Sequence, residues 1–214
     1  MSSNVGLIGT KLGMTHVFDE TGNSVPVTVI QAGPCPIVQV KKPDTDGYSA
    51  LQVGFESVPK HRLNKPQQGH FKKAGVHTTR RLVEFRTQST DGFEVGAELT
   101  VSQFSVGQAI NVQGKPIGKG FMGATKRHHF GRGPMSHGSK SHRIPGSIGA
   151  GTTPGRVYKG VKMSGRKPNK VVTTTNLQVV QVDTERNLLL VKGAVPGSTG
   201  AVVKIVPVVK GGKA

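Results

Sequence analysis

The chain has 214 residues, a formal net charge of +18 and a single cysteine, and 34% of its residues are hydrophobic, which is low for a fully globular protein. One cysteine excludes an internal disulfide and a cysteine-rich zinc site, and it fits a reducing compartment. No apolar run reaches the length of a membrane span, and the first residues lack the basic start and apolar core of a signal peptide. We therefore expect a soluble cytoplasmic protein with no membrane partner.

The first hundred residues contain short apolar or β-branched runs that are separated by strong turn signals. Gly, Asp and Pro supply turn geometry at residues 19–22, 33–34 and 43–47. The runs between them predict strands at residues 5–8, 15–18, 25–31, 37–40 and 51–55. This spacing is typical of an antiparallel β-barrel or β-sandwich, and we expect a mainly β fold.

Residues 59–81 interrupt this pattern and predict a small, partly helical insertion. Asn64 is a candidate helix cap, Pro66 suits the first turn and Gly75 suits the end, although Gly69 weakens the prediction. Strand character returns at residues 82–86, 98–101 and 109–112.

Two further β-rich runs, at residues 171–182 and 188–191, flank a turn at 183–187 and predict a hairpin, and a last strand is expected at 201–209. Because strands lie on both sides of the intervening basic stretch, that stretch is an internal excursion from one β-domain. We therefore expect a β-barrel domain formed by residues 1–112 and 171–214, with an extended basic loop at 113–170.

Charge is concentrated in the middle of the chain. Between Glu98 and Asp183 there is no acidic residue, whereas the same interval carries thirteen Lys and Arg residues. Residues 1–98 have a net charge of +2, residues 99–182 contribute +13 and residues 183–214 contribute +3. An uncompensated run of one sign repels itself when the chain compacts, so an external polyanion is implied. The Gly, Pro, Ser, His and Thr between the charges bury too little apolar surface to fold alone.

Three kinds of chemistry are disfavoured in the basic stretch. Residues 118–123 match the dinucleotide fingerprint GxGxxG, but the acidic residue required about twenty positions later is missing, and no Walker motif is present. His128, His129, His137 and His142 have neither cysteine nor carboxylate nearby, and the surrounding cations would repel a divalent metal ion. No acidic residue completes a catalytic triad locally. We therefore expect no cofactor, no metal ion, no small-molecule substrate and no catalytic residue.

With catalysis, cofactor binding and metal binding disfavoured, the charge and the backbone composition of the basic stretch indicate binding to RNA. Lys and Arg neutralise phosphates, histidines donate to phosphates or stack on bases, and glycine allows close approach of the backbone. Phe121, Phe130 and Tyr158 could each insert or stack, but they are too sparse for a single-strand stacking platform. The stretch is typical of an extended segment that enters the interior of a folded RNA. His61, His70 and His77 in the 59–81 insertion suggest the same role more weakly.

The expected RNA-binding residues are the basic side chains and histidines of the loop. They are Lys115, Lys119, Lys126, Arg127, His128, His129, Arg132, His137, Lys140, His142, Arg143, Arg156, Lys159, Lys162, Arg166, Lys167 and Lys170.

Sequence motifs along the chain carry a specific family resemblance. They are the opening GLIGTKLGMTHVF, then VPVTVI, DGYSALQVGF, KPQQGHFKKAG and EFR, the loop from GKPIGKGFMGATKRHHF to KMSGRKPNKVV, and the closing VVQVDTERNLLLVKGAVPGSTGAVV. With them the chain resembles, over essentially its whole length, the bacterial type of the large ribosomal subunit L-three family. Another nucleic-acid-binding module and an enzyme stay open as alternatives.

The resemblance implies a β-barrel of the kind found in translation proteins and a structural role in the large ribosomal subunit. It further implies early binding to large-subunit ribosomal RNA, contacts with neighbouring ribosomal proteins, and a loop that extends toward the peptidyl transferase centre. The uncharged stretch between Arg143 and Arg156 would hold the loop tip, at Gly149, Ala150, Gly151, Thr152 and Thr153.

Two positions depart from the family pattern. Pro116 stands where the family usually has Ser or Thr, which removes a hydroxyl and a backbone donor at the loop entrance. Thr152 stands where many bacterial members carry a glutamine that is methylated. That modification is therefore not expected in this chain.

Overall fold

The computed structural model describes residues 5–208, and the chain divides into two compact units. One unit comprises residues up to 116 together with those from 171 onward, and the other comprises residues 117–170. Within the described part of the chain, no helix is both long and apolar enough to cross a bilayer.

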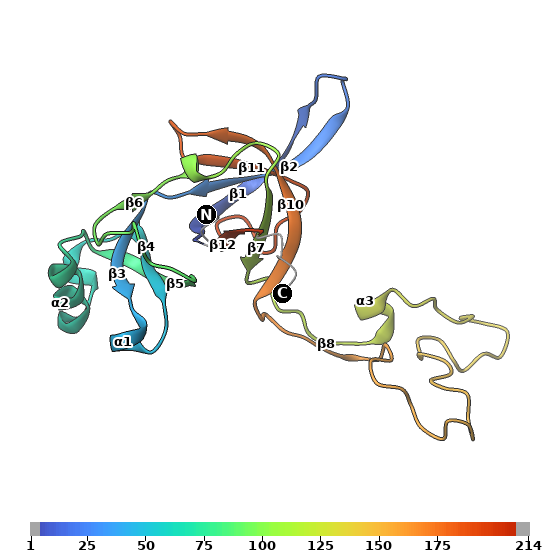
Figure 1. Ribbon diagram of the computed structural model, residues 1–214. Coiled ribbons are helices and arrows are strands. Elements are labelled where there is room, and N and C mark those ends of the chain that lie inside the picture. The colour runs from blue at the N-terminus through green and yellow to red at the C-terminus, as the bar shows by residue number, and fades with distance from the viewer. Residues whose placement is uncertain (1–4, 209–214) are drawn as a thin grey trace. The chain divides into compact units, whose positions relative to one another are not determined.

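Six antiparallel strands of the first unit form a closed ring (Figure 1). In the order in which they are hydrogen-bonded, they are β1 (Leu7–Phe18), β12 (Val202–Pro207), β7 (Ala109–Gly114), β10 (Val172–Asp183), β11 (Leu188–Lys192) and β2 (Ser24–Ala32). The ring is irregular, because the register shifts between Lys11 and Gly13 in β1 and at two places in β10. The expected mainly β, antiparallel fold is confirmed.

A second sheet of four antiparallel strands belongs to the same unit. Its strands, in order, are β5 (Thr79–Arg86), β4 (Ala50–Ser57), β3 (Cys35–Lys41) and β6 (Glu98–Leu99). Between β4 and β5 the chain forms a 3-10 turn, Lys60–Arg62, and the helix α2 (Lys65–Ala74). Asn64 N–H donates to Gln67 Oε1 (3.2 Å) at the start of α2, and Gly75 ends it with φ 68°. The predicted helical insertion is thus present, capped by the expected residues.

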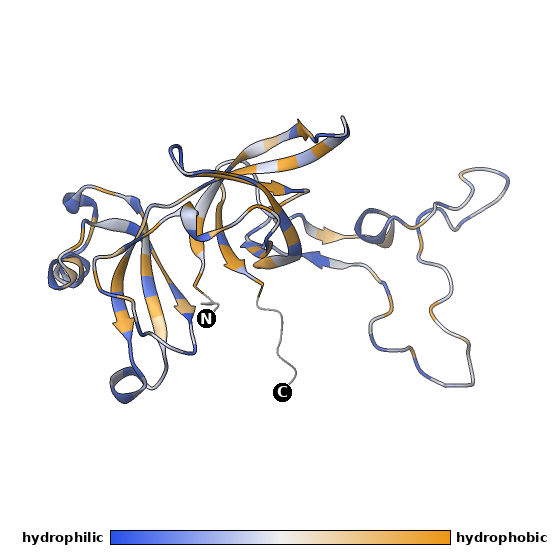
Figure 2. Cartoon of the chain, turned by 45° about the horizontal axis from the view of Figure 1, so that its top comes forward, coloured by the Kyte–Doolittle hydropathy of each residue, from blue (hydrophilic) through white to orange (hydrophobic). Residues whose placement is uncertain are grey.

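One hydrophobic core serves both sheets. Figure 2 shows apolar residues alternating with polar ones along the strands, as expected where one face of a sheet is buried. Ile30, Val112 and Ile205 from the ring and Val53 and Phe85 from the second sheet belong to the same cluster. The ring and the second sheet are therefore stabilised together by burial of apolar surface.

Two polar contacts also connect β12 with β5. Lys204 Nζ donates to the Glu84 carbonyl (2.7 Å) and lies 4.3 Å from the centroid of the Phe85 ring. Burial lowers the pKa of Lys204. The Glu84 carboxylate pairs with Lys41 (2.8 Å), and this contact holds the pKa of Glu84 below its ordinary value.

Cys35 is buried in the core, and burial raises the pKa of its thiol to about 11, which makes it a poor nucleophile at neutral pH.

Several predicted boundaries were wrong. The two strands expected at 5–8 and 15–18 are a single strand, β1, because a bulge lets it continue past Gly13. The turn expected at 43–47 is a short helix, α1 (Pro43–Asp46), which Pro43 starts and Gly47 ends with φ 79°. Strand β5 begins at 79, three residues before its predicted start, because Ser57 pairs with Thr79 across the sheet.

Two more strands are shorter than expected. The strand predicted at 98–101 ends at Leu99 and gives way to a 3-10 turn, Val101–Gln103, in which Val101 is buried in the core. Strand β12 (Val202–Pro207) leaves out residues 201 and 208 of its predicted range, and residue 209 lies outside the described residues. The hairpin predicted around 183–187 is confirmed by the antiparallel pairing of β10 with β11.

Candidate nucleic-acid interface

The segment 117–170 is inserted between two paired strands of the ring. Gly114 in β7 lies opposite Val172 in β10, so the ends of the insertion leave from neighbouring positions. Inside the segment, β8 (Gly120–Met122) pairs with β9 (Gly165–Lys167), and Lys119 N–H donates to the Lys167 carbonyl (2.9 Å). Neither strand was predicted, because three residues are too few to show an alternating pattern.

A five-residue helix, α3 (Ala124–His128), follows β8 and is fixed to the returning chain. Arg127 Nη1 donates to the Met163 carbonyl (2.9 Å), and His128 Nε2 lies 3.0 Å from the same oxygen. A Cβ at Gly165 would lie too close to the Arg127 guanidinium, so this glycine leaves room for the arginine in the position where it reaches Met163. The Met163 carbonyl therefore organises this part of the segment, and residue type alone could not have identified it.

Between α3 and β9 the chain runs in irregular loops (Figure 1), and few backbone hydrogen bonds join its residues. Gly133 N–H donates to the His142 carbonyl (3.0 Å), and the His142 ring nitrogen Nδ1 lies 2.9 Å from the Pro134 carbonyl oxygen. Ala124 is the only buried residue in 117–170. The segment thus has no hydrophobic core of its own.

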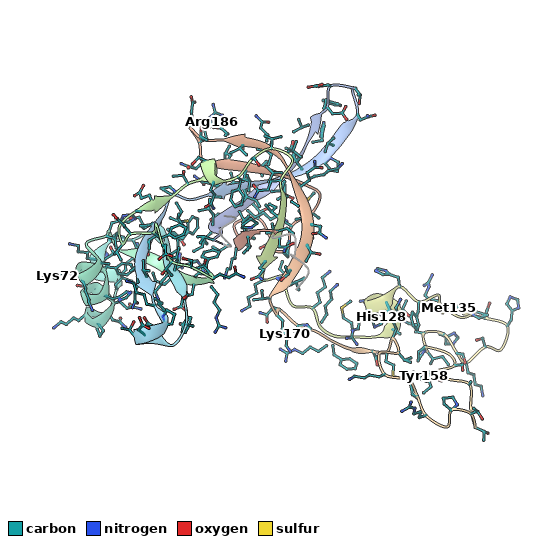
Figure 3. All side chains as sticks on the ribbon, in the orientation of Figure 1. Lys72, His128, Met135, Tyr158, Lys170 and Arg186 are labelled. Atoms are coloured by element: carbon teal, nitrogen blue, oxygen red, sulfur yellow. The ribbon has the colours of Figure 1, made fainter. Side chains whose placement is uncertain are left out.

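Most of the residues expected to bind RNA are exposed, and Figure 3 shows side chains extending outward along the loops around Met135 and Tyr158. The exposed ones are Lys115, Lys119, Lys126, His129, Arg132, His137, Lys140, Arg143, Arg156, Lys159, Lys162, Arg166, Lys167 and Lys170. Arg127, His128 and His142 are half-buried and make the internal contacts described above. These three stabilise the segment, which the sequence did not reveal.

Cationic and apolar side chains are exposed together on this segment. Phe121 is 76% exposed and Tyr158 is 61% exposed, with the Arg156 guanidinium 5.9 Å from the centroid of the Tyr158 ring. An open hollow beside α3 is lined by Lys119, Phe121, Met122, Thr125, Lys126 and His129. Phe130, the third aromatic residue, is half-buried with its ring 6.0 Å from that of His128. Phosphate and an unstacked base are the chemical groups that such a surface suits.

The structure also bears on the other sequence motifs. The GxGxxG match falls on β8 and on Gly123, the residue before α3, and β8 pairs antiparallel with β9, so the parallel βαβ unit of a dinucleotide site is not formed here. No cluster of metal-ligating residues occurs within 5–208. In the first unit, His61 and His77 are exposed, but His70 Nε2 lies 2.7 Å from Gln52 Oε1 and fixes α2 to the sheet.

The tip residues 149–153 are all exposed, and their hydrogen bonds are to Ser147 and Gly155. Gly155 N–H donates to the Gly151 carbonyl (3.1 Å), and Ser147 Oγ donates to the Gly149 carbonyl (3.1 Å). Gly151 has φ 100°, a backbone conformation that other residues rarely adopt. The tip is therefore a small, uncharged and exposed turn.

Known proteins match this chain along nearly its whole length. The family model for ribosomal protein L3 matches residues 73–188. Large ribosomal subunit protein uL3 of Synechococcus elongatus is 59% identical over 204 residues, which cover 95% of this chain and 96% of that protein. The uL3c protein of Porphyra purpurea is 57% identical over 202 residues, which cover 94% and 98% of the two chains. The chain therefore belongs to the ribosomal protein L3 family.

Proposed function

We propose that this chain is a structural constituent of the large ribosomal subunit and that it binds large-subunit ribosomal RNA through residues 117–170. The observation that carries the proposal is that this segment holds twelve Lys and Arg residues and no acid, yet buries a single residue. A chain of this kind does not offset its ordering entropy through a core. RNA phosphates supply the missing stabilisation.

The chemistry of the segment suits a folded RNA. Its exposed cations neutralise phosphates and release counterions, while its glycines let the main chain approach the RNA backbone. Phe121 and Tyr158 add two exposed aromatic faces on which a base could stack. In this role the chain is a structural protein and not an enzyme.

Three finer roles belong to the same proposal. The uncharged tip, residues 149–153, would reach toward the peptidyl transferase centre, where small residues fit between closely packed RNA strands. The cationic remainder of 117–170 would support early subunit assembly. Neighbouring large-subunit proteins would contact the first unit, which is the less basic of the two.

A salt titration of RNA binding tests the proposal. If six to ten phosphates are neutralised, the affinity of the full chain for large-subunit ribosomal RNA falls on the order of 10³ to 10⁵ between about 50 and 200 mM salt. The triple variant K126Q/R132Q/R143Q removes three exposed cations from the segment and should flatten the salt dependence, by about one unit of slope per residue.

The matched control K42Q/R186Q/K192Q removes three exposed cations of the first unit, so its net charge equals that of K126Q/R132Q/R143Q. It should keep the steeper slope. Equal slopes for the two triple variants would contradict a specific role of 117–170. Failure of the unmodified chain to bind the RNA would overturn the proposed function itself.

A further inference from the structure

The first unit contains a second interval without acidic residues. Between Glu56 and Glu84 there is no carboxylate side chain, whereas seven Lys and Arg residues occur there. The fold gathers them on the 3-10 turn Lys60–Arg62, on helix α2 and at the start of β5. Figure 3 shows Lys72 on the outer side of α2. The structure shows which of these charges are free.

Two of the seven cations are neutralised inside the protein. Arg80 and Arg81 both pair with Glu56, at 3.2 and 3.6 Å, and the other flanking acid, Glu84, is occupied by Lys41. The remaining five are exposed, and among residues 5–208 none has a carboxylate within 4.0 Å; they are Lys60, Arg62, Lys65, Lys72 and Lys73.

These free cations stand on a fixed support. Phe71 buries the inner side of α2 in the protein, and His70 contacts Gln52 on the sheet. Gln68 Nε2 donates to the carbonyls of Lys60 and Leu63, both at 2.8 Å, and so holds the 3-10 turn against the helix. A charged surface on a fixed backbone loses little entropy when it binds.

Gly69 lies between these lysines, and neither its backbone conformation nor its packing within the protein requires a glycine. It sits four residues after Lys65 and four before Lys73, so it shares their face of the helix. A Cβ at this position would meet no atom within 4 Å, and the backbone here is ordinary helix. Glycine within a helix is destabilising relative to alanine. A bare backbone at this point is explained if a partner approaches the helix closely.

We infer that this face, formed by Lys60, Arg62, Lys65, Lys72 and Lys73 around Gly69, is a second contact for the phosphate backbone of ribosomal RNA. The inference rests on the proposed function and adds a binding site outside 117–170. No large hydrophobic side chain between residues 57 and 81 is exposed, and the one exposed valine beside the face, Val95, lies at its edge in a hollow with Lys73. Charge therefore dominates the face, in contrast to the apolar centre of a typical protein interface. Phosphate is the partner that matches its charge.

Gly69→Ala tests the inference with effects of opposite sign. The added methyl group should raise the melting temperature of the free protein by about 1 to 4 °C, because alanine favours the helix. It should also weaken binding of the full chain to in vitro transcribed large-subunit ribosomal RNA. A more stable variant with unchanged affinity would overturn the proposed role of Gly69 and of this face.

Charge removal provides the second measurement. K65Q/K72Q/K73Q should lower the salt slope of RNA binding by about three units, one per lost phosphate contact, whereas the control K42Q/R186Q/K192Q should not. One outcome separates this inference from the proposed function. If the unmodified chain binds RNA and K126Q/R132Q/R143Q flattens the salt slope, but K65Q/K72Q/K73Q leaves it unchanged, then this inference fails while the proposed function stands. A photo-crosslinking residue at position 72 that labels a protein in assembled subunits, in place of RNA, would also overturn it.

Discussion

The two units of this chain differ in what stabilises them. In the first, 21 buried hydrophobic residues from the ring, the second sheet and the segments that connect them form one cluster. In residues 117–170, Ala124 is the only buried residue, and all the formal charges are positive. Burial of apolar surface stabilises the first unit, so its fold is determined by its own sequence. The second has no such core, and in the function proposed above its order depends on bound RNA.

This comparison explains why similar side chains have different roles in the two units. Lys204 is half-buried, donates to the Glu84 carbonyl and packs against Phe85, so it stabilises the fold. Lys126 and Arg132 are exposed, with no carboxylate anywhere in their segment. Charge that is paired within the protein is structural, and unpaired exposed charge of one sign is available to an anion.

The largest expected difference is in amide hydrogen exchange of the free protein. Amides of the ring strands should exchange only through global unfolding, which costs about 5–15 kcal/mol for a typical domain. Amides of residues 129–161 should open with a free energy close to zero, because they have few hydrogen bonds and no core. Exchange followed by mass spectrometry measures both regions in one sample.

Bound ribosomal RNA provides the matching control for this measurement. Protection should rise across 117–170 in the complex and stay constant in the ring. Strong protection of residues 129–161 in the free protein would contradict the view that their order depends on RNA.

A pair of identical substitutions gives the next largest effect. Ile205 is fully buried in β12, and replacing it by alanine should lower the free energy of unfolding by about 2–5 kcal/mol. Ile148, near the tip, is 45% exposed, and the same change should alter it by no more than about 0.5 kcal/mol. Chemical denaturation of the two variants measures the difference. A comparable loss in both would mean that 117–170 has a core that the structure does not show.

The sequence predicted the first unit well, because its signals are local and repeated. Apolar or β-branched runs between turn signals indicated most strands, and Asn64 and Gly75 marked the two ends of α2. The merging of two predicted strands into β1 was missed because the bulge between Lys11 and Gly13 depends on the partner strand β2. The division of the strands between a ring and a second sheet also depends on long-range pairing, which periodicity does not encode.

The charge and exposure of 117–170 were also predictable, but its internal contacts were not. An interval without acids and with many glycines predicted an RNA-binding segment, and 13 of the 16 predicted residues that lie in 117–170 are exposed. Arg127 and His128 converge on the carbonyl of Met163, 36 and 35 residues away. Such contacts are set by the backbone path, so the residue types alone did not distinguish these two side chains from their exposed neighbours.

The smallest expected effect on stability and assembly comes from the tip. Residues 149–153 carry no charge, are all exposed, and hydrogen-bond to Ser147 and Gly155, so their deletion should leave β8, α3 and β9 intact. Large subunits should therefore assemble with the shortened protein. If the tip reaches the peptidyl transferase centre, as we propose, the rate of peptide-bond formation or the sensitivity to drugs that bind there should change.

Two further variants serve as controls for the deletion of residues 149–153. Removal of the whole span 115–170 should impair assembly, since the cationic residues are lost with the tip. Replacement of 149–153 by a Gly-Ser stretch of equal length separates the side chains of Thr152 and Thr153 from the length of the loop. Assembly is followed by sedimentation, and catalysis by the reaction of bound aminoacyl substrates. Normal catalysis and normal drug sensitivity in subunits with the short deletion would show that the tip stops short of the centre, and the role of 117–170 would then lie in its cationic residues alone.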